Sequence, residues 1–397
     1  MNSKRFISIL SSVIIFFTLI FIPVFANSEE IIDNDYNFSL DFPEGFFLEG
    51  STQDKKTFLF SNKKIPVTIV LKVFPEQNAK SSLETTLQKL SASSEIADFV
   101  WNEKNCSFSF FEMNISGNKN KSSGWALSSF IEKSNSSVVI LTYADEKNLA
   151  SSQCFFFSIL NSLKIDEEDS FKCGPIIDFT FPQKNKIPVS VKINQKEIKS
   201  SIYEEDVAAS RFLIDTEYSV LKNYANDENW KEAWKRYYRA LYRDTRGRIK
   251  NFTNDVYSVL YKDLKNQNSK NMRYDLNKML LSWVQNLSYG RENNPNGADF
   301  SSIPQILTGS ISDCDSRSLM LCAMLNQIGV ESVLFVSNEY HHAVYGSYIN
   351  PASASENANI IIEEKPFLLC ETTKKGLNPG LIASDMNQTE KWIPVIF

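Results

Sequence analysis

The sequence predicts an α+β protein in three parts: an N-terminal α+β sandwich, a helical connector and a C-terminal α+β domain. Residues 31–165 alternate period-two strand patterns with two helical patterns, and residues 203–265 carry aromatic and apolar side chains at helical spacing. Residues 266–397 contain one strongly apolar helix that precedes several short strands. A chain of 397 residues suits two or three domains of ~100–200 residues each.

Residues 1–26 have the pattern of a secretory signal peptide. Lys4 and Arg5 form a positive start, residues 6–24 are apolar, and Ala26 offers a cleavage site. We therefore expect export from a bacterial cell, to the periplasm or beyond it, with no membrane span left after cleavage. The alternative is an uncleaved N-terminal anchor, because the apolar run is nearly long enough to span a bilayer.

The N-terminal domain, residues 31–165, is expected to consist of antiparallel strands and two helices. Residues 36–42 place an apolar side chain at every second position, and the turn residues Pro43 and Gly45 end this strand. The further elements expected are strands at Thr57–Phe60, Pro66–Phe74, Ser107–Phe111, Trp125–Phe130 and Val138–Tyr143, and helices at Ser82–Leu90 and Leu149–Leu163. Strands covered by segregated helices make an α+β layer structure.

The order of these elements resembles the PsbP-type α/β/α sandwich. The resemblance covers residues 36–165 and is seen best in the opening YNFSLDFPEGF and the closing FFFSILNSLKI. It is carried by pattern and by no chemical motif. That family implies a binding or adaptor role for the N-terminal domain.

Residues 166–265 are expected to form a linker followed by a helical connector. The basic side chains of its central helix and the residues after it are Lys231, Lys235, Arg236, Arg239, Arg243, Arg246, Arg248 and Lys250. Aromatic residues interleaved with bases can bind an anionic polymer. Because the formal net charge of the chain is −5, we favour a packed amphipathic helix with a solvated cationic face, and we expect no nucleic-acid partner.

Six cysteines occur in the chain, at positions 106, 154, 173, 314, 322 and 370. Disulfides persist outside the cytoplasm. If the protein is exported, Cys106, Cys154 and Cys173 could therefore include one disulfide, although spacing alone does not determine the pairing.

The stretch SISDCDSRSLMLCAMLNQIGV, residues 310–330, predicts a buried helix that begins at a cysteine. Asp313 suits the N-cap, which puts Cys314 in the first turn. The helix dipole favours an anion there, so we expect the pKa of the Cys314 thiol to fall. Two interpretations compete: Cys314 is either packing near a helix start or an activated nucleophile. Cys322, eight residues on, is interpreted as packing.

A thiolate enzyme also needs a general base, and the chain has only two histidines, His341 and His342. Neighbouring side chains of a strand face opposite ways, so only one of them can face Cys314. His342 begins a period-two strand and is the first choice, with His341 in reserve. Glu371 ends a later strand and could accept a hydrogen bond from the imidazole.

The segments SDCDSRSLML, HAV and CETT together resemble the transglutaminase-like superfamily of papain-fold cysteine enzymes. The resemblance spans residues 280–390. It implies a papain-like α+β domain over residues 266–397 with Cys314 as nucleophile, His342 as general base and Glu371 as the acid that orients the imidazole. That family more often has Asp at the third position and Gly before the Asp-Cys pair, where this chain has Glu371 and Ser312.

The oxyanion donors are less well defined by the pattern. The backbone N–H of Cys314 together with a side chain from Gln285 or Tyr289 is a guess, and a structural role for either side chain is an equal alternative. A metal site formed by Cys314, Asp315 and the two histidines is disfavoured, because adjacent histidines diverge on a strand. We expect neither a metal nor a cofactor.

These observations predict an exported cysteine-dependent amide hydrolase or acyl transferase that works through an acyl-enzyme on Cys314. Its substrate would be a protein or peptide, such as a cell-wall peptide. The alternative is a catalytically inactive envelope binding or scaffold protein that has kept the fold.

Overall fold

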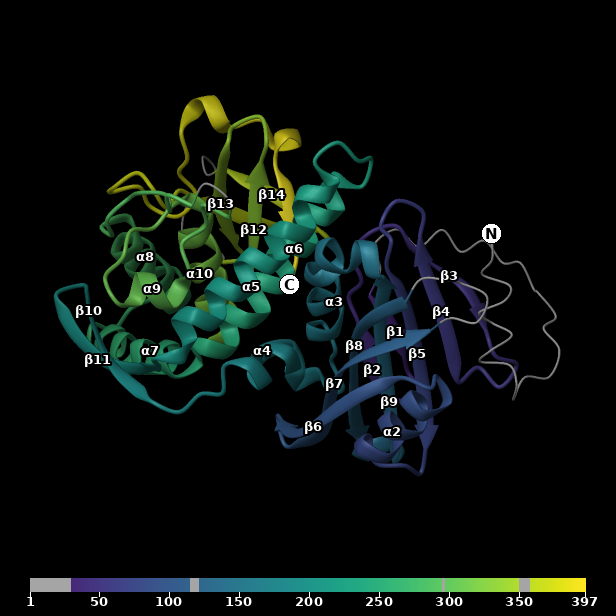
Figure 1. Cartoon of the computed structure of the whole chain (residues 1–397). Helices are drawn as coiled ribbons and strands as arrows, with labels where there is room; N and C mark the ends of the chain where they lie inside the picture. Colours follow the sequence, from purple (N-terminus) through teal and green to yellow (C-terminus); the bar gives the residue numbers. More distant parts are fainter. Residues whose placement is uncertain (1–29, 115–120, 295–296, 350–357) are drawn as a thin grey trace. The chain divides into compact units, whose positions relative to one another are not determined.

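The computed structural model of the chain describes residues 30–114, 121–294, 297–349 and 358–397 (Figure 1). The predicted signal peptide, residues 1–26, lies outside these residues. Helices and strands both occur throughout the described chain, which confirms the α+β class. Among the described helices, none combines the length and the apolar character needed to cross a membrane.

The chain divides into two compact units. The first contains the described residues from Glu30 to Ser170 together with Gly174–Thr180 and Ser219–Ala233. The second contains Phe171–Cys173, Phe181–Tyr218 and Trp234–Phe397. The predicted connector, residues 166–265, therefore contributes segments to both units.

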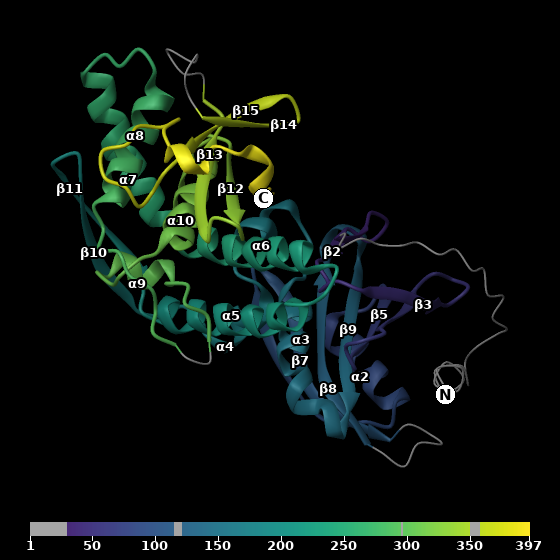
Figure 2. The same cartoon turned by 90° about the horizontal axis from the view of Figure 1, so that it is seen from above.

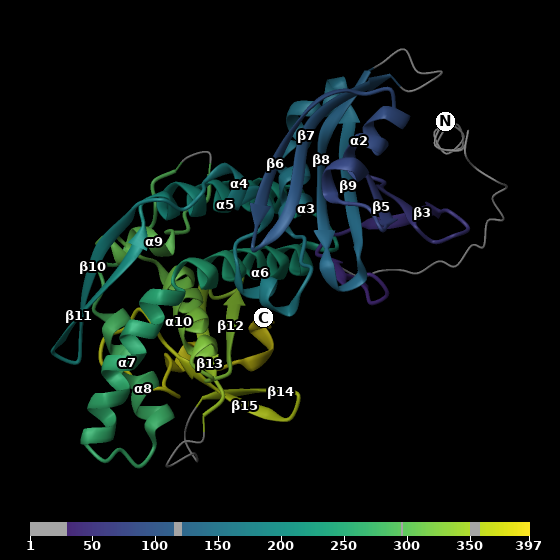
Figure 3. The same cartoon turned by 90° about the horizontal axis from the view of Figure 1, so that it is seen from below.

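The first unit is built on an antiparallel sheet of seven strands in the order β3-β4-β5-β9-β8-β7-β6 (Figure 3). Its strands are β3 (Phe46–Ser51), β4 (Thr57–Asn62), β5 (Thr68–Pro75), β6 (Ser93–Trp101), β7 (Lys104–Asn114), β8 (Lys121–Ile131) and β9 (Ser136–Asp145). A separate antiparallel pair is formed by β1 (Ile31–Asp33) and β2 (Phe38–Leu40). The helices are α2 (Ala79–Lys89), α3 (Leu149–Asn161) and α4 (Pro175–Thr180).

Both faces of this sheet are covered by helices, because successive side chains of a strand point to opposite faces. Ile69 of β5 packs in the same apolar cluster as Phe156 of α3. Its neighbour Val70 packs in a second cluster with Leu83 of α2. The unit is therefore a helix–sheet–helix sandwich, as predicted.

Two strands of this sheet, β3 and β6, were not predicted from the sequence. Both are edge strands, and most of their side chains are exposed or half-buried. Val100 of β6 is 61% exposed and Leu48 of β3 is 52% exposed. An edge strand is held by backbone hydrogen bonds on one side and can lack a buried face, so it leaves little period-two signal.

The described part of the second unit contains a hairpin, six α-helices and a second sheet. The hairpin consists of β10 (Lys186–Ile193) and β11 (Lys196–Tyr203). The helices are α5 (Glu205–Leu221), α6 (Trp230–Arg248), α7 (Lys250–Asn266), α8 (Met272–Gln285), α9 (Ile303–Leu307) and α10 (Cys314–Gln327), of which α5 and α6 also have residues in the first unit.

The sheet of the second unit has five antiparallel strands in the order β14-β15-β13-β12-β16. They are β12 (Ser332–Ser337), β13 (His342–Ser347), β14 (Asn359–Ile362), β15 (Lys365–Cys370) and β16 (Ile393–Val395). Helix α10 packs against β12 and β13 (Figure 2). An apolar cluster that includes Phe335, Val344, Phe367 and Trp392 is also packed on this sheet. The sheet thus places the start of β13 and the segment after β15 beside the start of α10.

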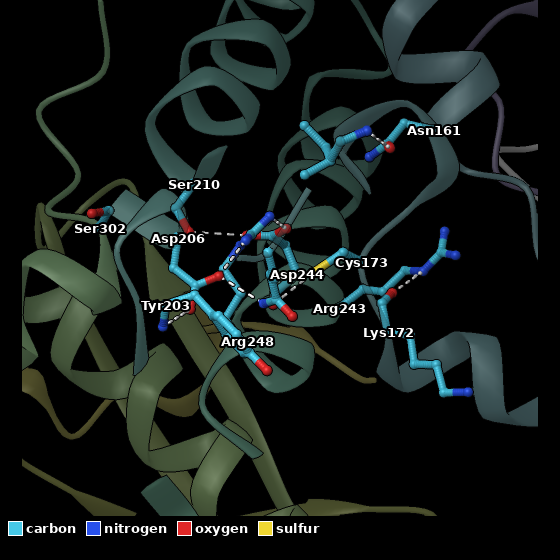
Figure 4. A network of polar contacts seen from close by, with 12 residues as sticks. Asn161, Lys172, Cys173, Tyr203, Asp206, Ser210, Arg243, Asp244, Arg248 and Ser302 are labelled. Carbon is cyan, nitrogen blue, oxygen red and sulfur yellow. Dashed lines mark hydrogen bonds and ion pairs between the residues drawn. The ribbon is translucent and has the colours of Figure 1, made fainter. Parts of the chain in front are cut away.

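The predicted solvated cationic face of α6 is wrong for three of its arginines. Arg236, Arg243 and Arg248 are only 3%, 8% and 5% exposed. Arg248 donates to Asp206 at 2.7 Å and to Asp244 at 2.8 and 2.9 Å (Figure 4). The acidic partner Asp206 lies on α5, far away in the sequence, so helical periodicity alone could not show that these arginines are buried.

All six cysteines are described, and none forms a disulfide. The expected pair among Cys106, Cys154 and Cys173 is therefore absent. Cys106 is 2% exposed and contacts the Ser129 hydroxyl at 3.2 Å, while Cys154 packs at the margin of the same apolar cluster. These two thiols act as small apolar side chains of the sandwich.

Candidate functional site

Cys314 is the first residue of α10, as predicted. Asp313 is the N-cap, with extended backbone angles. Its carboxylate accepts from the backbone N–H of Ser316 at 3.2 Å, and the Ser316 hydroxyl accepts from the backbone N–H of Asp313 at 3.0 Å. Such a reciprocal capping box satisfies two donors and typically stabilises a helix start by ~1 kcal/mol. The cap therefore fixes the backbone that carries the thiol.

The two histidines occupy different positions. His341 is exposed, with a left-handed φ of 47°, in the turn between β12 and β13. His342 is the first residue of β13, its side chain is 11% exposed, and its ring lies 6.5 Å from the Trp392 ring between centroids. Of the two candidates, His342 is therefore the one that is enclosed.

Glu371 follows directly after β15 and contacts His342. The distance from His342 Nε2 to Glu371 Oε2 is 2.8 Å. The other carboxylate oxygen accepts from the backbone N–H and the hydroxyl of Thr373, both at 2.7 Å. Burial alone would raise the pKa of Glu371, but the hydrogen bonds and charge of His342 together with the Thr373 donors hold that pKa below its usual value. Glu371 is thus held as a carboxylate beside the imidazole.

Cys314 contacts the two chain segments that carry His342 and Glu371, namely the start of β13 and the segment after β15. Its thiol receives a hydrogen bond from the backbone N–H of Ala343, the residue after His342. The Thr372 hydroxyl, next to Glu371, lies 3.5 Å from the Cys314 carbonyl oxygen. The start of α10 therefore adjoins both backbone segments that carry the imidazole and the carboxylate.

The expected fall in the pKa of the Cys314 thiol is wrong. The side chain is buried, with the residue 3% exposed. Burial, followed by the negative charges of Asp315 and Asp313, raises its pKa to about 12, against smaller opposing effects of the Ala343 N–H and Arg291. Desolvation disfavours the charged form more than the helix dipole favours it. The resting side chain is therefore a neutral thiol.

The two aspartates that flank Cys314 form part of a buried acidic group. Burial and the neighbouring Asp315 raise the pKa of Asp313. Asp315 accepts a hydrogen bond from the Tyr238 hydroxyl at 2.9 Å, and burial raises the pKa of that tyrosine well above its usual value. A proton shared within this group lowers the negative charge that the thiol would otherwise face.

Gln285 is engaged elsewhere and does not suit the guessed oxyanion role. Its side-chain nitrogen donates to the Glu371 carbonyl at 2.8 Å and to the Leu377 carbonyl at 3.0 Å, while its oxygen accepts from the Gly376 N–H at 3.0 Å. An amide nitrogen has two hydrogens, and both are used. Gln285 therefore holds the segment after β15, which agrees with the structural alternative.

Tyr289 is placed beside the thiol. A bridge pairs it with Ser312, two residues before Cys314, and the residue is 55% exposed. Burial and the neighbouring Cys314 raise the pKa of Tyr289, while a hydrogen bond with Arg291 opposes this shift. Arg291 is in turn paired with Asp299 at 2.9 Å. Of the two side chains guessed as oxyanion donors, Tyr289 is the one whose ionisation is influenced by Cys314.

Arg317 is a residue of the site that reasoning from the sequence did not single out. It lies one turn after Cys314 on α10, is 0% exposed and has its guanidinium carbon 5.3 Å from the centre of the Tyr289 ring. The sequence did contain a signal for it, because Arg317 is an arginine within an otherwise apolar helix. An arginine is rarely fully buried unless its charge has partners.

Within the described chain, no cluster of three or more His, Cys, Asp or Glu side chains is arranged to hold a metal ion. The donors closest to one another at this site, His342 and Glu371, are joined by their own hydrogen bond. The carboxylate of Glu371 can orient the imidazole of His342, and an oriented imidazole is suited to accept or donate a proton.

No family model matches the sequence, and none of the curated proteins matches it. Among solved structures, the cyanobacterial PsbP protein CyanoP of Synechocystis is 9% identical with a TM-score of 0.29, covering 37% of this chain and 97% of that one. A protein from Bacteroides thetaiotaomicron is 10% identical with a TM-score of 0.26, covering 82% and 88%. A protein from Cytophaga hutchinsonii, described as a candidate cysteine protease, is 11% identical with a TM-score of 0.20, covering 89% and 80%. These likenesses are too weak to assign an activity, so the transglutaminase-like resemblance stays a prediction.

Proposed function

We propose that the second unit is a transglutaminase-like cysteine enzyme that transfers an acyl group through Cys314. The observation that carries the proposal is the 2.8 Å contact between His342 and Glu371. The residues after them, Ala343 and Thr372, contact Cys314, the first residue of a buried helix. A nucleophile, a base and a group that orients the base are the three parts that thiol acyl transfer requires.

The chemistry follows from which ring nitrogen is free. His342 Nε2 is committed to Glu371, so Nδ1 is the nitrogen left to take the thiol proton. Because the resting thiol is neutral, this proton moves as the sulfur attacks a carbonyl carbon. The bond from sulfur to carbon forms, the amide C–N bond breaks, and the imidazolium returns the proton to the leaving amine. Water or an amine then attacks the thioester and restores the thiol.

The developing oxyanion needs donors, and two groups are suited to supply them. The backbone N–H of Cys314 belongs to the first turn of α10 and therefore has no acceptor within the helix. The Tyr289 hydroxyl is the second candidate, because Tyr289 is bridged to Ser312 near the thiol. The acyl donor is a peptide bond or a glutamine side-chain amide, and we favour water as the acceptor.

A non-catalytic scaffold is the second candidate function, and two observations favour it. Cys314 is 3% exposed, and burial raises the pKa of its thiol to about 12. A buried thiol of this kind is inert unless a partner removes its proton. In that case the polar contacts of His342 and Glu371 would only stabilise the sheet.

An activated ester separates the two functions without knowledge of the natural substrate. Wild-type protein mixed with p-nitrophenyl acetate should release a burst of about one p-nitrophenol per chain and carry the acetyl group on Cys314, as found by peptide mass mapping. The Cys314→Ala variant should give no burst. Glu371→Gln should acylate about a thousandfold more slowly or worse, because the imidazole loses its orienting carboxylate.

The adjacent histidines provide a matched pair of controls. His342→Gln should abolish the burst, whereas His341→Gln, which changes an exposed side chain one residue away, should retain it. Absence of a burst from correctly folded wild-type protein would reject the enzyme and leave the scaffold. If a burst occurs, incorporation of a fluorescent amine into a glutamine peptide would identify transfer, and peptide cleavage would identify hydrolysis.

A further inference from the structure

Arg317 connects three separate segments of the candidate site. Its Nε donates to the Ser312 hydroxyl at 2.8 Å, in the turn before Cys314. Its Nη1 donates to the carbonyl of Thr372 at 3.1 Å, directly after Glu371. Its Nη2 donates to the carbonyl of Leu287 at 2.6 Å, just beyond the end of α8. One planar group therefore links the segments that carry the thiol, the carboxylate and the chain leading to Tyr289.

The burial of this guanidinium is unusual because none of its hydrogen-bond acceptors is charged. Arg317 is 0% exposed, and among the described residues no carboxylate lies within ion-pair distance of it. The acidic groups whose charge acts on it are, in decreasing order, Tyr289, Asp313, Cys314 and Glu371, all of the candidate site. A buried cation without a carboxylate partner is costly, so its place beneath the site calls for a reason.

We propose that Arg317 is a positioning residue that holds Cys314 in register with the His342–Glu371 pair by clamping Ser312, Thr372 and Leu287. This inference rests on the proposed function. Arginine suits the task because its N–H groups point outward in a fixed plane, so the three acceptors cannot move independently of one another. A lysine keeps the charge but presents its donors from one rotating nitrogen.

The clamp also sets the orientation of Tyr289. The guanidinium lies against the ring of this tyrosine at 5.3 Å, and the backbone of the same segment is tied to Ser312 by the hydrogen bonds from Ser312 N–H to Ser288 at 2.9 Å and from Gly290 N–H to Ser312 at 3.0 Å. Loss of the clamp would therefore misplace the thiol and the nearby hydroxyl together. Small misplacements of this kind lower reaction rates strongly.

The test measures the acylation of Cys314 by p-nitrophenyl acetate as a function of pH in wild type, Arg317→Lys and Ser312→Ala. In wild type, the rate should level off with rising pH, because the imidazole takes the proton from the attacking thiol. In Arg317→Lys, the rate at neutral pH should fall about tenfold to a hundredfold and should keep climbing at alkaline pH, because the thiol must then ionise unaided. Ser312→Ala removes one acceptor and should change the rate in the same direction by less.

The matched control is Arg248→Lys, which makes the same substitution at a buried arginine away from Cys314. Its burst can lose amplitude through partial unfolding, but its rate and pH profile should match wild type. A purely structural Arg317 would likewise change amplitude alone. If wild type shows a burst and both Arg317→Lys and Ser312→Ala keep its rate and pH profile, the positioning role is refuted while the proposed function stands. If wild type shows no burst, the function fails and the clamp fails with it.

Discussion

Arg248 and Arg317 are both buried side chains of the second unit, yet their surroundings differ in kind. Arg248 is enclosed by two carboxylates, and Asp244 and Asp206 raise its pKa although burial alone would lower it. Arg317 meets a hydroxyl and two backbone carbonyls, and burial lowers its pKa. The first arginine neutralises acids within a helical core. The second brings an uncompensated charge to the backbone segments that carry Cys314 and Glu371.

The difference between Arg248 and Arg317 shows that a buried charge can have two different roles. Removing one partner of a compensated buried pair is strongly destabilising, because the other charge is left buried without a partner. A buried charge that is not compensated reduces stability, and such costs concentrate at functional sites. The first of three predictions, given in order of decreasing effect, tests this distinction, and the other two test the ionisation of Cys314 and Glu371.

Replacing each arginine by methionine should separate the two regions most clearly. Arg248→Met leaves Asp206 and Asp244 buried without a cation and should lower the free energy of unfolding by about 3–5 kcal/mol. Arg317→Met leaves only neutral acceptors unsatisfied and should cost about 1–3 kcal/mol. Urea unfolding of the two variants beside wild type, followed by far-ultraviolet circular dichroism, measures both values. Equal losses would show that the two arginines play the same role.

The loss of stability at alkaline pH, measured as the free energy of unfolding, should depend on Cys314. Its pKa is raised from an ordinary value near 9 to about 12 in the folded protein, so its contribution is complete below pH 9 and is lost as the pH rises toward 12. Between pH 8 and pH 10, wild type should therefore lose about 1 kcal/mol more stability than Cys314→Ala. Parallel unfolding curves at these pH values would instead indicate a thiolate already paired with the imidazole.

The loss of stability at acid pH should depend on Glu371, and this effect is expected to be the smallest of the three. Its folded-state pKa lies below the ordinary value of 4.5, so its contribution is present above that pH and is lost as the pH falls through the folded-state pKa. The stability difference between wild type and Glu371→Gln should therefore shrink between pH 6 and pH 3. Denaturant unfolding at several pH values checks this, and a constant difference would argue against the His342–Glu371 contact.

Local patterns were sufficient to predict the parts of the site that lie on regular elements. Asp313 and the apolar run after it indicate a capped, buried helix that begins at Cys314, and both features are present. The choice of His342 over His341 followed from strand alternation, and His342 is the enclosed ring in contact with Glu371. The reactive roles of these residues stay predictions until acylation is measured.

Properties that depend on distant segments could not be predicted in this way. The pKa of Cys314 depends on how completely other elements cover it, and the local dipole argument therefore gave the wrong direction. Similarly, Arg317 of the apolar helix donates hydrogen bonds to Thr372 and Leu287, which are far from it in the sequence. No rule of residue spacing could have predicted these contacts. The burial of Arg248 is set by Asp206 on another helix.

The capping box at the start of α10 has a consequence for how the thiol could be tuned. Asp313 caps the start of the helix through Ser316 and also raises the pKa of the neighbouring thiol. A substitution of Asp313 therefore changes both the helix cap and the pKa of the thiol. A change that makes the cysteine more reactive also destabilises the backbone that positions it. Substitutions of Asp315 or Arg291 should change the pKa of the thiol more selectively, because these side chains act on the thiol but do not cap the helix.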